Sequence, residues 1–341
     1  MAEIEWLLVV STEIEKLVET LKADLEATSN EGHFKLSKSQ YKLLEAGARI
    51  ASEKPDRADF LHSVMCLVGL PRRKTDARTF ERQSGHVNIL LEAGKLWNGT
   101  EWVEQPIPYG TIPRLVMVHV SSKAIVTKSR SIEVGHSMRQ FLTALDMQTN
   151  GGERGGYTTL KRQMEALAAC RLTLGMQSHG RVVTVDAKPI KRFEAWLQHD
   201  GTQHTLWPGV LELSQDFYDT LLEHAVPLDY RALAALKHSA LALDIYTWLA
   251  HRLCRVNKAS GVKLSWQNLR GQFGQEYSSS KNFKREFRDV LRQVCVVYPD
   301  ARIESTPGGL ILYPSHPPLP RTSISLALPL KSQMPVDNSD D

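Results

Sequence analysis

The spacing of apolar residues predicts several helices in the first half of the chain. Apolar positions recur every three or four residues over 39–53, 137–147 and 157–169, as they do on one face of a helix. The run 111–128 fits both the period of a strand and the period of a helix. Its segment LVMVHV has the composition of a strand, whereas Pro113 near the start of the run suits the first turn of a helix.

Strands and turns are predicted between these helices. Residues 86–104 alternate between apolar and polar side chains, and Asn98-Gly99 within them is a hairpin signal. Two further alternating stretches, near 171–184 and 193–206, predict strands. A helix, a turn, a second helix and then a β-ribbon is the order of elements in a winged helix.

A similar order recurs in the second half. We expect a long helix over 227–256, a short helix over 265–273, a turn at 274–278, a basic helix over 279–294 and a hairpin over 302–313. The predicted fold class is α+β and mainly helical, with two tandem winged-helix domains that carry β-hairpin wings. The expected parts are an acidic N-terminal amphipathic helix, a first winged-helix domain, a second winged-helix DNA-binding domain and a Pro-rich acidic disordered tail, over 1–36, 37–205, 206–315 and 316–341. A short crossover near 200–214 is expected between the two domains.

The N-terminal segment carries a row of apolar residues at heptad spacing, namely Leu7, Val10, Ile14, Leu17 and Leu21. Two interpretations are open. The row is either a short coiled-coil seam between two copies of the chain or the apolar face of a helix that packs on its own domain.

Charge changes this picture because it is unevenly distributed. Residues 1–32 hold eight acids and two lysines, and residues 331–341 hold one lysine and three acids. The net charge of the chain is +4, so the body between these ends is strongly basic. A basic body with acidic ends is typical of a protein that binds a polyphosphate, although a basic enzyme has the same balance.

Other features of the sequence exclude several classes of protein. No apolar run is long enough to span a membrane, and the acidic N-terminus does not resemble a signal peptide, so we expect a cytoplasmic protein. The cysteines, Cys66, Cys170, Cys254 and Cys295, are far apart and sit in apolar surroundings, which favours buried thiols over a metal site.

The predicted helix over 279–294 has two contrasting faces. At about 100° per residue, Lys281, Arg285, Arg288 and Arg292 fall within an arc of about 60°, nearly opposite Phe283 and Phe287. Serines at the start leave N–H donors free for a DNA phosphate, and asparagine and arginine are the residue types that read adenine and guanine. The alternative is a solvated basic face without a ligand. The predicted DNA-binding residues here are Ser279, Ser280, Lys281, Asn282, Lys284, Arg285, Arg288 and Arg292.

The first predicted domain offers a weaker set of DNA-binding candidates. The outer face of the helix over 157–169 carries a threonine and two basic residues, but Glu165 shares that face, so a polar surface without a ligand is an equal alternative. Basic residues nearby would add phosphate contacts. The candidates are Lys128, Arg130, Arg154, Thr158, Lys161 and Arg162.

Catalytic motifs do not fit the sequence. Gly151 and Gly156 have the spacing of a P-loop, but Tyr157-Thr158 stands where lysine and serine or threonine would hold phosphate and metal. A nicking enzyme needs paired histidines, whereas His119 stands alone in MVHVS. We therefore expect no enzymatic activity, no metal and no cofactor.

The combination of several motifs resembles the RepA-type initiators of plasmid replication over roughly residues 40–315. The motifs are Gly110-Thr-Ile-Pro-Arg-Leu115, Lys128-Ser-Arg130, Ile132, Gly135, Ser137 and Phe141; Gly151-Gly152, Arg154-Gly155, Leu160 and Gln163-Met164; and Leu228-Asp-Tyr230, Leu243-Asp-Ile-Tyr246, Leu249, Arg252, Ser265-Trp266 and Phe273-Gly274. The resemblance implies a helix over 111–128 and two winged-helix domains that bind iterons, the direct repeats of a plasmid origin, in double-stranded DNA.

The same resemblance implies partners. Such initiators help to open an AT-rich segment and recruit the host initiator DnaA and the replicative helicase. They form homodimers that repress their own gene and monomers that initiate. The alternatives from other classes are a winged-helix transcriptional repressor without a role in initiation and, with less support, a nicking replication enzyme.

Overall fold

The computed structural model describes residues 37–85, 87–133, 138–145, 147, 149, 152, 155–178, 181–186, 189–200 and 203–319. Residues 1–44 and 45–341 form two separate units, and apart from one helix that begins at Lys38 the description below concerns the second. The predicted N-terminal seam and Arg154 lie outside the described residues.

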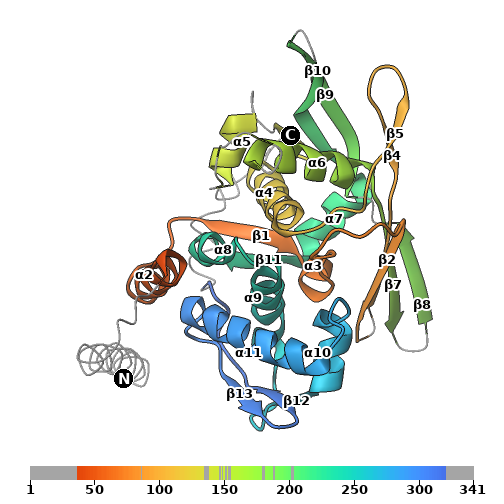
Figure 1. Cartoon of the computed structure of the whole chain (residues 1–341). Helices are drawn as coiled ribbons and strands as arrows, with labels where there is room; N and C mark the ends of the chain where they lie inside the picture. The colour runs from red at the N-terminus through yellow and green to blue at the C-terminus, as the bar shows by residue number, and fades with distance from the viewer. Residues whose placement is uncertain are drawn as a thin grey trace, which may run out of the picture. The chain divides into compact units, whose positions relative to one another are not determined.

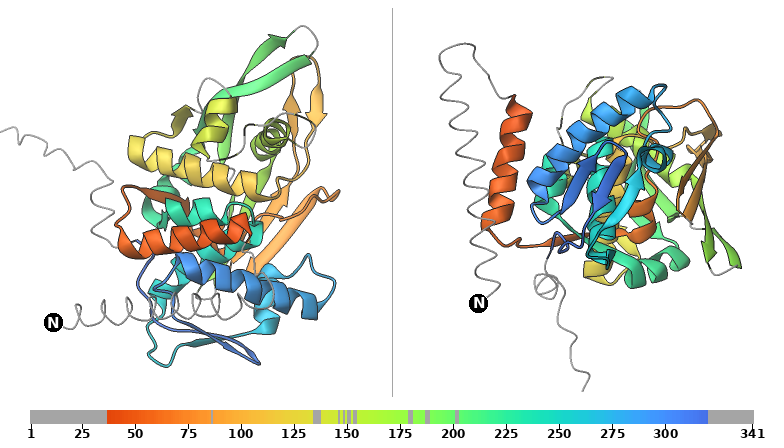
Figure 2. Two further views of the ribbon diagram at one scale, coloured as in Figure 1. Left: turned by 60° about the vertical axis from the view of Figure 1, so that its left-hand side comes forward. Right: turned by 90° about the horizontal axis from the view of Figure 1, so that it is seen from below.

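Helices and antiparallel strands alternate along the chain, which confirms the predicted α+β class (Figure 1; Figure 2 gives two further views). The helices are α2 (Lys38–Ser52), α3 (Ser63–Leu67), α4 (Thr111–Thr127), α5 (Met138–Ala144), α6 (Gly156–Ala169), α7 (Gln215–His224), α8 (Tyr230–Leu236), α9 (Ala240–Arg252), α10 (Trp266–Phe273) and α11 (Ser280–Val297), with a 3₁₀ turn at Leu253–Arg255. The strands are β1 (Ala58–His62), β2 (Thr79–Ser84), β3 (Val87–Glu92), β4 (Lys95–Trp97), β5 (Trp102–Glu104), β6 (Ser131–Glu133), β7 (Arg171–Ser178), β8 (Arg181–Asp186), β9 (Ile190–Asp200), β10 (Gln203–Leu213), β11 (Ala225–Asp229), β12 (Val262–Ser265), β13 (Ile303–Thr306) and β14 (Gly309–Leu312).

Helices α4 and α9 form the centre of the core. Apolar residues surround both helices on nearly all sides, and a helix of this kind is stable only when neighbouring elements cover it. All residues from Leu241 to Ala250 of α9 are buried. Helix α9 lies between α11 and the antiparallel pair of β1 and β11 (Figure 1). The centre of the protein therefore joins segments that are far apart in sequence.

A buried ion pair connects these two central helices. The guanidinium of Arg114 on α4 donates to both carboxylate oxygens of Asp244 on α9, over 2.6 Å from Nε and 2.8 Å from Nη2. Arg82 of β2 lies 3.9 Å from the same carboxylate and donates to the backbone carbonyls of Gly69 and Leu70. The charges compensate one another and bind backbone carbonyls, as buried charges require, although Nε of Arg82 has no hydrogen-bond partner among the described residues.

Two segments of the chain repeat one order of elements. In the first, α4, β6, α5 and α6 precede the hairpin of β9 and β10, with the β7–β8 hairpin inserted after α6. In the second, α9, β12, α10 and α11 precede the hairpin of β13 and β14. The strands pair in the orders β6–β10–β9 and β12–β14–β13, so in both segments the last strand lies between the other two.

Several local predictions are confirmed. The run 111–128 is helix α4, as the resemblance implied, and the hairpin around Asn98-Gly99 is formed by β4 and β5. The short helix predicted over 265–273 is α10, and its N-cap is Ser265, whose hydroxyl accepts a hydrogen bond from the backbone N–H of Asn268. The predicted basic helix is α11, which continues beyond its expected end to Val297.

The prediction of one long helix over 227–256 was wrong. Residues Ala225–Asp229 form strand β11, and the helical part is divided between α8 and α9. Ser239 starts the second helix by accepting a hydrogen bond from the N–H of Ala242. Strand β11 exists because β1 pairs with it, and no local pattern reports a partner about 170 residues away.

Two expectations for strands also need correction. The alternating stretch 86–104 is not one hairpin, because β3 pairs with β2 and β7 in a separate sheet. The expected crossover near 200–214 is strand β10, which spans the predicted boundary after residue 205. The division into two winged-helix domains stays a prediction.

The beginning of the predicted C-terminal tail packs against the body. The Tyr298 hydroxyl donates to the carbonyl of His316 over 2.6 Å, and Leu319 is buried. The tail beyond Leu319 lies outside the described residues. No helix within the described part of the chain is long and apolar enough to span a bilayer.

Burial of His119 on α4 predicts a dependence of stability on pH. Burial, followed by the charges of Lys123 and Arg57, lowers the pKa of His119 to about 4, from about 6.5 in an unfolded chain. Below about pH 6.5 His119 is protonated in the unfolded state but stays neutral in the folded state. The free energy of unfolding therefore decreases as the pH falls from about 6.5 towards 4. Replacing His119 with glutamine should reduce the acid-induced loss in the free energy of unfolding by about 2–3 kcal/mol.

Urea denaturation of wild type and His119→Gln at about pH 7 and about pH 4 measures this difference. His224→Gln is the matched control, because the side chain of His224 is 59% exposed. It should follow the wild type. An unchanged pH dependence in His119→Gln would show that the buried imidazole is not the group that titrates.

Candidate nucleic-acid interface

Helix α11 begins with a polar end that is open to a ligand. Ser279 is its N-cap by backbone conformation, but its side chain makes no capping hydrogen bond. The N–H groups of the first turn of a helix lack intrahelical acceptors. Together with the positive end of the helix dipole, they favour an anion at this position.

One face of α11 is buried against aromatic residues of α10 and the turn that follows. Phe287 lies 6.0 Å from Trp266 and 5.5 Å from Phe273, measured between ring centroids, and Phe283 lies 5.5 Å from Tyr277. The buried residues of the helix are Phe283, Phe287, Val290, Leu291, Val294 and Val297. This packing fixes the rotation of α11 about its axis and so decides which side chains reach solvent.

The predicted DNA-binding residues occupy the opposite, solvent-facing side of α11. Lys284 is half-buried, as are the starting residues Ser279 and Ser280. The exposed members are Lys281, Asn282, Arg285, Arg288 and Arg292. The predicted separation of an apolar face from a basic face is confirmed.

Two cations of this side stack on one indole ring. The guanidinium carbon of Arg288 lies 4.7 Å from the centroid of the Trp266 ring, and Nζ of Lys284 lies 5.8 Å from it. Attraction to the face of the ring restrains both side chains without neutralising them. Trp266 therefore holds two positive charges at the edge of α11 that faces α10.

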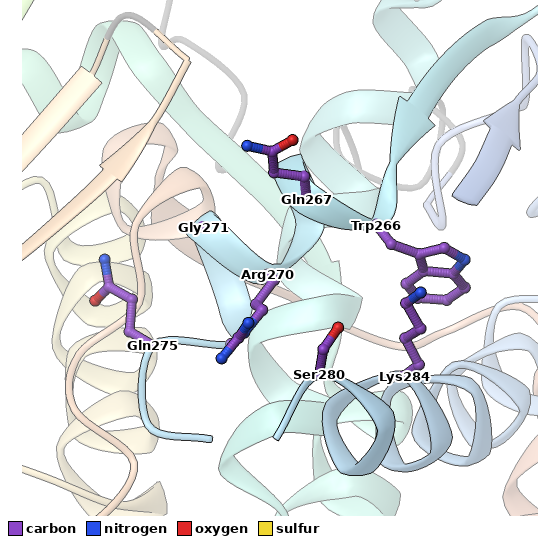
Figure 3. Close-up of a pocket in the computed structure, with 8 residues that line it drawn as sticks. Trp266, Gln267, Arg270, Gly271, Gln275, Ser280 and Lys284 are labelled. Atoms are coloured by element: carbon purple, nitrogen blue, oxygen red, sulfur yellow. The ribbon is translucent and has the colours of Figure 1, made fainter. Parts of the chain in front are cut away.

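A hollow of about 500 Å³ lies at this edge, between α10 and the start of α11 (Figure 3). Figure 3 shows Arg270 from α10 and Ser280 from α11 on the two sides of this space. Cationic, amide and hydroxyl groups line it, contributed by Trp266, Gln267, Arg270, Gly271, Gly274, Gln275, Ser280 and Lys284. Such groups suit phosphate and sugar oxygens.

The acids of α11 are engaged by their neighbours. Asp289 forms an ion pair with Arg292, which balances the charge at the C-terminal half of the exposed side. Glu286 accepts a hydrogen bond from Tyr277, and burial together with this bond raises the pKa of Tyr277 to about 12. The unbalanced positive charge therefore lies on the N-terminal half of α11.

The candidates of the first segment are spread over two places. Lys128 is exposed and ends α4 in a left-handed conformation, and Arg130 forms an ion pair of 3.0 Å with Glu212 of β10. On α6, Thr158 donates a hydrogen bond to the carbonyl of Gly152. Lys161 is half-buried and Arg162 is exposed.

The sequence pattern did not predict all the residues that contribute to this surface. Trp266 and Arg270 come from α10, and only the packing of two helices brings them beside Lys284. A local signal was present in the basic triplet Arg72-Arg73-Lys74, which lies in a loop before β2. The described residues contain no cluster of three or more metal-ligating side chains.

The fold and this surface define an α+β protein with two similar helix-and-hairpin segments, the second of which carries an exposed cationic helix. Residues 107–268 match the family model described as plasmid encoded RepA protein. The match confirms the predicted resemblance and supports a RepA-type plasmid replication protein. It runs from just before α4 into α10 and ends before α11. Neither the curated proteins nor the solved structures gave a match.

Proposed function

We propose that this plasmid replication protein is an initiator that binds repeated sequences of origin DNA through α11. The observation that carries the proposal is the exposed cationic side of α11, with an open N-terminus and an opposite side fixed by aromatic packing. Cations on a rigid helix neutralise phosphates of the duplex, which supplies affinity.

The order of elements supports two tandem winged helices. In a winged helix, a short strand follows the first helix, and the hairpin after the recognition helix pairs with that strand. Both repeated segments have this order and the same pairing of strands. In this proposal α11 is the recognition helix of the second segment, and the turn between β13 and β14 is the tip of its wing.

Docking of α11 in the major groove assigns different roles to its side chains. Residues near the start of a recognition helix reach base edges, and those further along meet phosphates. Asn282 and Arg285 lie in the first turns and are exposed. Arginine pairs with guanine through two hydrogen bonds, and asparagine pairs with adenine in the same way.

Replacing Arg285 with alanine should weaken binding by about 1–3 kcal/mol and relax the preference at one base pair. The reason is the loss of a two-pronged contact with one base. The probe is a duplex selected by the full-length protein from a random-sequence pool. Affinities for the selected duplex and for its single-base variants measure both effects.

Arg292→Ala is the matched control on the same helix. Arg292 lies two turns later and is paired with Asp289, so its loss should affect all sequences alike and lower the salt dependence by one phosphate contact at most. If the two variants behave identically on all duplexes, α11 contacts only phosphates, and the residues that recognise bases lie elsewhere.

The remaining parts of the proposal rest on the family. Opening of the origin and recruitment of a host initiator and helicase are expected of a RepA-type initiator in the bacterial cytoplasm. We further propose that the protein acts without catalysis. A supercoiled plasmid carrying its origin should then stay supercoiled when incubated with the protein and magnesium.

A further inference from the structure

A second cavity borders α11 on the side away from Trp266. Its volume is about 140 Å³. Three separate parts of the chain line it. They are the basic loop before β2, the start of α9, and the turn before α11 together with α11 itself. The lining residues are Arg72, Arg73, Ser239, Ala240, Leu241, Glu276, Tyr277 and Glu286.

Arg72 has an unused donor in this region. Its side chain is only 7% exposed, its Nε donates to Glu276 over 3.1 Å, and its guanidinium lies 5.0 Å from the centroid of the Tyr277 ring. These contacts hold the guanidinium in place. Its Nη1 is buried and has no hydrogen-bond partner among the described residues. A buried donor without an acceptor is costly, so an acceptor from a bound anion would relieve that cost.

The start of α9 adds two further donors. The Ser239 hydroxyl caps the N–H of Ala242, whereas the N–H groups of Ala240 and Leu241 belong to the first turn, which has no intrahelical acceptors. Both residues line the cavity. The positive end of a 13-residue helix therefore points at the same space as Arg72.

The two carboxylates of the cavity are already engaged. Glu276 is shared between Arg72 and Arg82, and Glu286 accepts a hydrogen bond from Tyr277. Arg73 is exposed and has no ion pair in the described part of the chain. The hydrogen bond from Tyr277 leaves Glu286 with its negative charge, so the positive potential that attracts an anion comes from Arg73 and from the start of α9.

We propose that this cavity holds a phosphate of the DNA backbone, on the strand opposite to the one that meets the Trp266 hollow. The inference rests on the proposed docking of α11. A helix about 10–12 Å across fills a major groove about 12 Å wide, so phosphates of both strands flank it. Lys284 and Glu286 are two residues apart, about 200° around the helix, and they line the hollow and the cavity respectively.

The DNA-binding surface is then composite. Arg72 and Arg73 precede the whole second segment and belong to the part of the chain predicted as the first domain. The contacts of Arg72 with Glu276 and Tyr277 attach this loop to the turn before α11. The loop thereby sets the position of α11 along the backbone of the duplex.

The test replaces single phosphates of the duplex selected by the full-length protein with neutral methylphosphonates. Each modified duplex is titrated with wild type, Arg73→Ala and Lys258→Ala. Lys258 is an exposed cation before β12, at the end of the sheet away from the β13–β14 turn. One methylphosphonate position should weaken wild type and Lys258→Ala several-fold and Arg73→Ala clearly less, because Arg72 and the start of α9 remain in that variant. Arg73→Ala should also lower the slope of log affinity against log salt by about 0.9.

The outcomes separate this inference from the proposed function. If Arg73→Ala keeps the wild-type slope and the wild-type methylphosphonate profile while Arg285→Ala weakens binding, the cavity holds no phosphate and α11 still binds DNA. If neither Arg285→Ala nor Arg73→Ala alters binding, both proposals are wrong.

Discussion

Replacing Asp244 with asparagine is expected to lower the free energy of unfolding by about 3–5 kcal/mol. The Asp244 carboxylate is 6% exposed and accepts two hydrogen bonds from Arg114, with Arg82 at 3.9 Å. Asparagine keeps the size of the side chain but removes its charge. The guanidinium of Arg114 would then stay buried among backbone carbonyls without a counterion, and the desolvation of that cation would no longer be offset.

Asp289→Asn provides a matched control for the same chemical change. Asp289 pairs with Arg292 on the surface, where its side chain is 49% exposed. Its removal should change stability by less than about 1 kcal/mol, because water solvates the arginine that is left. Urea denaturation of both variants gives the comparison. Equal, small losses would show that the ion pair between α4 and α9 contributes little to stability.

DNA binding is expected to weaken by about 10³-fold or more between about 50 and 200 mM salt. The cations available to phosphates in our proposal are Lys281, Lys284, Arg288, Arg270, Arg72 and Arg73, in addition to Arg285 at the bases. Each neutralised phosphate releases counterions, and about six contacts give a slope near −5 in log affinity against log salt.

Titrations of the selected duplex at several salt concentrations give this slope. Lys258→Ala should keep it, because Lys258 lies away from the proposed interface. Weak dependence on salt, with a slope close to zero, would contradict docking on the phosphate backbone and with it the proposed function.

The sequence by itself determined the local elements whose signals are local. The short helix after Ser265, Asn98-Gly99 as a turn and the two faces of α11 follow from residues within a few positions of one another. The family resemblance also followed from the sequence, and it corrected the ambiguous period of 111–128. In α11 the contrast between aromatic and basic positions is strong enough to predict which side is exposed.

Only the tertiary structure decided how distant segments combine. Strand β11 required β1, and the surface beside α11 required Trp266 and Arg270 on one side and Arg72 and Arg73 on the other. The buried charge of Asp244 has its partner on α4, 130 positions earlier in the chain. Periodicity reports which face of an element is apolar, but not what covers that face. Which element covers a buried strand, charge or indole depends on how segments from the whole chain pack together, and local periodicity carries no information on that packing.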